Sequence, residues 1–67
     1  MALISASQLQ PDDMVSIRGD IREIKDIRSL ETSRGRELVL VFKAGSPVRL
    51  QPTDEVQTSL YWRQLRR

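Results

Sequence analysis

The sequence predicts a small all-β domain, because its apolar residues follow the patterns of strands. The strongest sign is the run LVLVF at residues 38–42, five consecutive apolar residues that include two valines. A second sign is the alternation of Val15 and Ile17 with polar neighbours before Gly19-Asp20. The third is the stretch GDIREIKDIRSL at residues 19–30, whose three isoleucines favour extended backbone. Together these segments predict a core built from a sheet rather than from helices.

The first 13 residues are expected to form a turn segment. Residues 5–13, SASQLQPDD, place turn-forming Ser, Pro and Asp around the single apolar residue Leu9. We expect a turn, or a single helical turn, that holds Leu9 against the core. A strand then follows and ends in a tight turn at Gly19-Asp20. Arg18-Gly19-Asp20 also spells the integrin-binding tripeptide, but glycine at positive φ and a turn-tolerant aspartate favour a plain β-turn.

Two interpretations of residues 19–30 compete. Asp20 as a cap, with Glu23 three residues later, is typical of a helix start. However, Ile21, Ile24, Ile27 and Leu30 are spaced strictly by three, and at 3.6 residues per turn such steps drift around a helix instead of forming one face. A bent strand fits better, with a bulge near Lys25-Asp26 that returns Ile24 and Ile27 to the same side.

The next elements predict a hairpin. Residues 31–37, ETSRGRE, form a polar loop, and residues 36–51 then give two strands around a tight turn at residues 43–46. Residues 52–55, PTDE, suit a short 3₁₀ turn before the last element. Its two adjacent acids offer fewer oxygen ligands than a calcium site needs, so a structural turn is the better interpretation.

Residues 56–67, VQTSLYWRQLRR, form a basic aromatic tail with two alternatives. Val56 and Thr58 suit a short strand that completes the sheet. Leu60, Tyr61 and Leu65 share one helical face, which favours a short C-terminal helix instead. The pattern alone leaves both open.

The order of elements resembles that of small SH3-like or Sm-like β-barrels. The residues that carry the resemblance are Leu9 to Val15, Gly19-Asp20, Leu38 to Phe42, Gly45, and Pro52 to Val56. It implies a five-stranded barrel over residues 1–67 as one domain, with a 3₁₀ turn before the last strand, and a general habit of binding. It implies no site residues, because the aromatic groove of peptide-binding SH3 domains and the short motifs of the RNA-binding relatives are absent.

Composition excludes several classes of function. The chain of 67 residues has no cysteine and no histidine, so the usual metal ligands and nucleophile–base pairs are missing. We therefore expect no enzyme, no metal and no cofactor. No stretch approaches the roughly 20 apolar residues of a membrane span, and the first dozen do not read as a signal peptide, so a cytoplasmic location is expected.

Charge is unevenly distributed along the chain. The formal net charge is +2, but residues 1–55 carry eight Lys or Arg against nine Asp or Glu, which gives −1. Residues 56–67 carry three arginines and no acid, which gives +3. A basic terminal segment points to an anionic partner such as nucleic acid.

We predict a non-enzymatic binding module with two candidate surfaces. Arginines in the polar loop can pair with phosphates, and aromatics among arginines in the tail can stack on bases. The predicted binding residues are Arg34, Arg36, Tyr61, Trp62, Arg63, Arg66 and Arg67. The alternative is a protein-interaction module or small subunit of a larger assembly, since Tyr and Trp also dominate protein interfaces.

Overall fold

The protein is an all-β domain in the computed structural model, which describes residues 2–58. Six strands and one short 3₁₀ helix follow one another along this part of the chain. They are β1 (Ala2–Ser5), η1 (Ala6–Gln8), β2 (Met14–Ile17), β3 (Asp20–Thr32), β4 (Gly35–Phe42), β5 (Val48–Leu50) and β6 (Glu55–Thr58).

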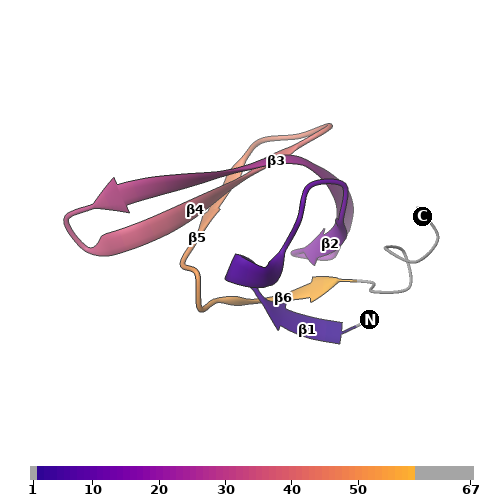
Figure 1. Cartoon of the computed structure of the whole chain (residues 1–67). Coiled ribbons are helices and arrows are strands. Elements are labelled where there is room, and N and C mark those ends of the chain that lie inside the picture. The colour runs from indigo at the N-terminus through magenta and orange to yellow at the C-terminus, as the bar shows by residue number, and fades with distance from the viewer. Residues whose placement is uncertain (1, 59–67) are drawn as a thin grey trace.

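The strands form one antiparallel sheet in the order β1-β6-β2-β3-β4-β5 (Figure 1). β1 and β5 are its edges, so within residues 2–58 the sheet is open rather than closed into a barrel. Five strands were predicted, and the sixth is β1, which lies inside the predicted N-terminal turn segment. It forms because Ala2–Ser5 pairs with β6, from the other end of the described chain, and sequence pattern does not reveal such a distant partner.

The stretch that follows Gly19 is a strand rather than a helix, as the spacing argument favours, and β3 is 13 residues long. Its first residues pair with β2 and the rest pair with β4, so β3 belongs to both halves of the sheet. The register shifts between Ile24 and Asp26, which confirms the predicted bulge at Lys25. Ile24 is consequently fully buried and Ile27 packs beside it on the core, while Ile21 is exposed.

The β2–β3 turn has two central residues, Arg18 and Gly19, between the paired residues Ile17 and Asp20. Both central residues have positive φ, 52° and 86°, which is the pattern of a type I′ turn. This confirms that the Arg-Gly-Asp tripeptide lies in a turn. Glycine adopts such a conformation freely, but arginine does so at a cost.

A lean apolar core lies on the concave side of the bent sheet. Every second residue of β4 contributes to it, and Leu9 is pinned onto it after η1, as predicted. The buried apolar residues are Ala6, Leu9, Val15, Ile24, Leu38, Leu40, Phe42 and Val56. Thr58 is also fully buried, and its hydroxyl donates a hydrogen bond of 2.7 Å to the carbonyl oxygen of Met14.

The predicted hairpin at residues 36–51 is confirmed by the pairing of β4 with β5. The connection to β6 is a single turn, as expected, closed by one hydrogen bond between residues three apart. The Asp54 N–H donates to the Gln51 carbonyl, and the Asp54 carboxylate accepts the Gln51 N–H at 2.8 Å. The Pro52 carbonyl accepts the N–H of Ser7, which ties this turn to η1.

Candidate functional site: an arginine-lined pocket

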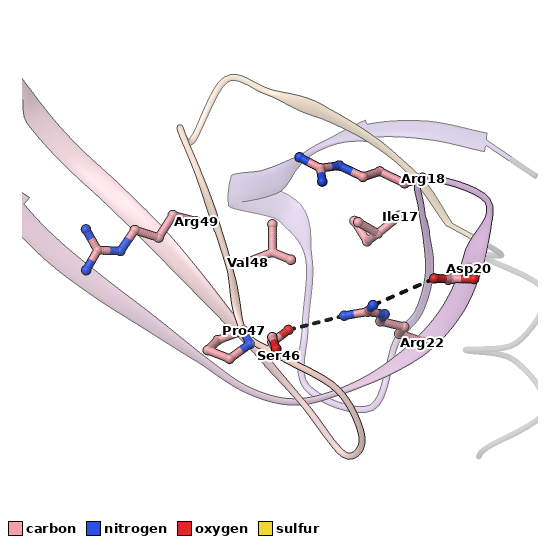
Figure 2. A pocket seen from close by; sticks show the side chains of 8 residues that line it. All are labelled: Ile17, Arg18, Asp20, Arg22, Ser46, Pro47, Val48 and Arg49. Atoms are coloured by element: carbon pink, nitrogen blue, oxygen red, sulfur yellow. Dashed lines mark hydrogen bonds and ion pairs between the residues drawn. The ribbon is translucent and has the colours of Figure 1, made fainter.

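A pocket of about 540 Å³ lies where the β2–β3 turn faces the start of β5 (Figure 2). Its walls come from the end of β2, the first residues of β3 and the residues that lead into β5. The lining residues are Ile17, Arg18, Asp20, Arg22, Ser46, Pro47, Val48 and Arg49. Three arginines against one aspartate make this wall predominantly cationic.

Arg22 is held in place from several directions. One guanidinium nitrogen donates a hydrogen bond of 3.2 Å to the Ser46 carbonyl, and the other lies 3.7 Å from an Asp20 carboxylate oxygen. The guanidinium carbon also lies 5.4 Å from the centre of the Phe42 ring, within the range of a cation–π contact. Three contacts therefore hold the Arg22 guanidinium at the pocket wall, and Figure 2 shows the two polar ones as dashed lines.

Gly45 lets the β4–β5 connection approach this guanidinium. A Cβ atom at position 45 would lie 3.0 Å from one guanidinium nitrogen of Arg22 and 3.2 Å from its central carbon. The φ of Gly45 is also positive, at 93°, which side chains disfavour. The positive φ thus favours glycine at this position, and a side chain there would displace the Arg22 guanidinium by a few tenths of an ångström.

Arg18 and Arg49 are held less firmly. Among residues 2–58, Arg18 has no recorded ion pair or side-chain hydrogen bond, and it projects from the strained turn. Arg49 has only a long contact, 3.9 Å from a Glu37 carboxylate oxygen, and its side chain is 70% exposed. Figure 2 shows the Arg49 guanidinium extending away from the other two. Arg18 is therefore the pocket cation most available to a ligand.

Of the predicted site residues, the structure describes Arg34 and Arg36 and places them away from this pocket. Both lie at the far tip of the long β3–β4 hairpin (Figure 1). Arg36 pairs with Glu31 across the strands at 3.5 Å, whereas Arg34 has no ion pair within the described chain. The remaining predicted residues lie outside the described residues: Tyr61, Trp62, Arg63, Arg66 and Arg67.

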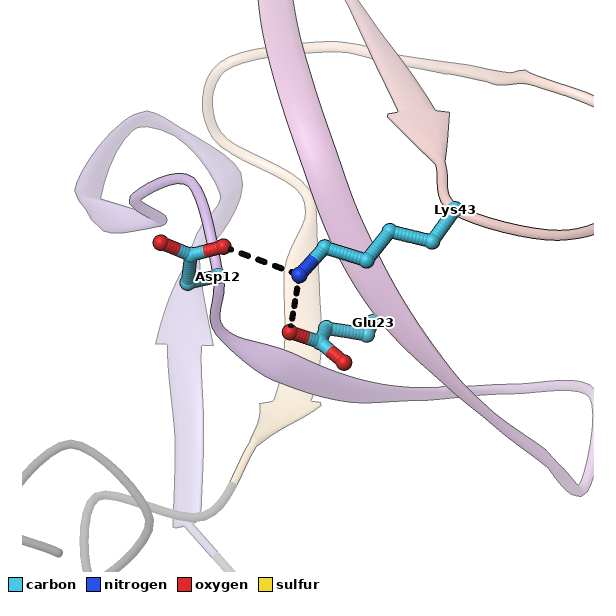
Figure 3. Close-up of polar contacts among 3 residues, drawn as sticks. All are labelled: Asp12, Glu23 and Lys43. Atoms are coloured by element: carbon cyan, nitrogen blue, oxygen red, sulfur yellow. Dashed lines mark hydrogen bonds and ion pairs between the residues drawn. The ribbon is translucent and has the colours of Figure 1, made fainter. Parts of the chain in front are cut away.

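A second polar cluster joins the N-terminal loop to the sheet (Figure 3). The Lys43 ammonium lies 2.6 Å from a Glu23 carboxylate oxygen and 3.3 Å from one of Asp12. These groups are partly exposed, so the cluster is a structural clamp of modest strength. Among residues 2–58, no group of three His, Cys, Asp or Glu side chains is arranged to hold a metal ion.

Sequence reasoning missed the pocket arginines as a group. Arg18 was interpreted only as part of the Arg-Gly-Asp turn, and Arg22 and Arg49 were not among the predicted binding residues. One signal was present, since a type I′ turn normally takes Asn or Asp before glycine, and arginine at that place is unusual. The convergence itself depends on tertiary contacts between positions 24 residues apart.

Searches against protein-family models, curated proteins and solved structures found no match to this chain. In the part of the chain that the structure describes, no helix has the length and apolar character needed to cross a membrane.

Proposed function

We propose that this protein is a non-enzymatic binding module of the SH3-like class that binds nucleic acid. Five neighbouring strands, in the order β6-β2-β3-β4-β5, support the SH3-like assignment. A turn precedes β6, the last of them along the chain, and the bent strand β3 belongs to both halves of the sheet. The cationic pocket is the single observation that carries the binding proposal.

The chemistry of the pocket favours phosphate. Guanidinium groups present planar N–H forks that match phosphate oxygens, and Arg22 is already oriented by its neighbours. Arg34 at the hairpin tip supplies another cation without a carboxylate partner among the described residues. The three tail arginines add charge next to β6 in sequence. Each of these groups supplies positive charge of the kind that attracts polynucleotides.

Salt dependence of binding tests this proposal. If the protein neutralises three phosphates of a single strand, the logarithm of the binding constant should fall with the logarithm of the salt concentration with a slope of about −2. Fluorescence anisotropy should be measured with labelled single-stranded and duplex DNA and RNA between about 50 and 200 mM salt, the range in which such contacts weaken strongly. Absence of binding to all four at the lowest salt would refute nucleic-acid binding.

A protein-interaction module is the second candidate, and the edge strand β1 favours it. Its sequence, ALIS, lacks the charges and proline that commonly protect sheet edges. Leu3 on this strand is 58% exposed, so a partner strand that pairs with β1 would cover it. Sedimentation that shows a monomer, with Leu3→Lys behaving identically to the wild type, would remove support for self-association through this edge.

A further inference from the structure

We infer that the arginine-lined pocket is a subsite for one unpaired nucleotide, with the phosphate held between Arg18 and Arg22. The inference rests on the proposed nucleic-acid binding. It adds where one nucleotide binds, a preference for single-stranded over duplex nucleic acid, and separate roles for the two arginines.

Arg22 is the preorganised phosphate donor. Its guanidinium carries five N–H donors, and its contacts with Ser46 and Asp20 leave most of them for a ligand. The Phe42 ring and the close approach of Gly45 restrict its side-chain motion. A ligand therefore meets a donor that loses little conformational entropy on binding.

Arg18 is the closing donor. It lines the same pocket from the β2–β3 turn and has no ion pair or side-chain hydrogen bond within residues 2–58. Its backbone φ is positive, a conformation that arginine rarely adopts. Backbone strain of this kind is often found at ligand sites. Binding would give this guanidinium the anionic partner that the described part of the fold does not supply.

The size and walls of the pocket favour a nucleotide over a bare phosphate ion. A volume of about 540 Å³ falls within the usual range for small-molecule sites, which begins near 300 Å³. Ile17 and Val48 are half-buried apolar walls beside the arginines, and Pro47 adds a third apolar surface. A sugar or base can pack there only if it is not stacked inside a duplex, so the pocket selects single strands.

Matched variants separate this subsite from general electrostatic attraction. Arg18→Ala and Arg34→Ala each remove one unpaired turn arginine, but only Arg18 lines the pocket. Arg22→Lys and Arg28→Lys each keep the charge, and Arg28 lies on the exposed surface beside Asp26. Thermal melts of all four establish that the fold is retained before binding is compared.

Anisotropy with fluorescein-labelled oligothymidylate should show the difference. Loss of a charge-assisted contact predicts about tenfold weaker binding for Arg18→Ala and for Arg22→Lys. Arg34→Ala loses one surface charge outside the pocket and should bind only about two- to threefold more weakly. Arg28→Lys keeps its charge and should bind as tightly as the wild type. The duplex should bind more weakly than the single strand.

Titration with thymidine 5′-monophosphate, followed by amide chemical shifts, tests the pocket independently. The Gly19 and Ser46 amides should shift saturably with the nucleotide, and much less with thymidine. Equal losses in Arg18→Ala and Arg34→Ala, or a duplex bound as tightly as the single strand, would overturn the subsite while nucleic-acid binding stands. Saturable shifts without oligonucleotide binding would instead overturn the proposed function and leave a nucleotide pocket.

Discussion

Replacing Arg18 with asparagine is expected to stabilise the fold while it weakens ligand binding. A residue with a side chain pays roughly 1–2 kcal/mol in the left-handed region, and asparagine tolerates this region better than arginine. Asn-Gly is also a preferred central pair of a type I′ turn. Because Arg18 has no recorded side-chain partner within residues 2–58, little is lost, and we expect a gain of about 1 kcal/mol in unfolding free energy.

Thermal and urea unfolding measure this gain. For a domain of this size, 1 kcal/mol corresponds to a rise in Tm of roughly 4–8 °C. Arg18→Ala is the control, because alanine removes the same charge but keeps the unfavourable backbone conformation. Its Tm should stay close to that of the wild type. If Arg18→Asn melts no higher than Arg18→Ala, the assignment of strain to this turn is incorrect.

Three further substitutions test the fold. Ile24→Ala removes a fully buried side chain at the bulge and should cost about 2–5 kcal/mol in urea unfolding; a cost below 1 kcal/mol would contradict its core position. Thr58→Val keeps the shape but leaves the Met14 carbonyl without its hydroxyl donor, so a loss of about 1 kcal/mol is expected, and no change in Tm would contradict the bond. Lys43→Met removes the partly exposed ion pairs of the clamp and should lower the free energy of unfolding by at most about 1 kcal/mol, and by less at high salt. A loss of stability that does not depend on salt would point to packing instead.

Much of the sheet could be predicted because its signals are local. Steps of three drift around a helix, which favoured a strand after Gly19, and the alternation of a strand placed the bulge near Lys25-Asp26, where the register shifts. Edge strand β1 could not be predicted, because it pairs with β6, whose residues lie 50 to 56 positions later in the chain. The hydrogen bond from the Ser7 N–H to the Pro52 carbonyl could not be predicted for the same reason.

The candidate site, like the sheet, could be predicted from the sequence only in part. The sequence by itself determined the all-β class, the glycine turns and the position of Arg34 in a polar loop, because alternation and turn chemistry act over a few residues. Only the tertiary structure decided that Arg18 and Arg22 line one pocket together with Ser46. The bulge bends β3, and the bend brings the β2–β3 turn to the start of β5. The physical reason is that the pocket exists only where separate segments of the folded chain lie side by side. In the sequence, its arginines show the same pattern as arginines on the exposed face of a strand.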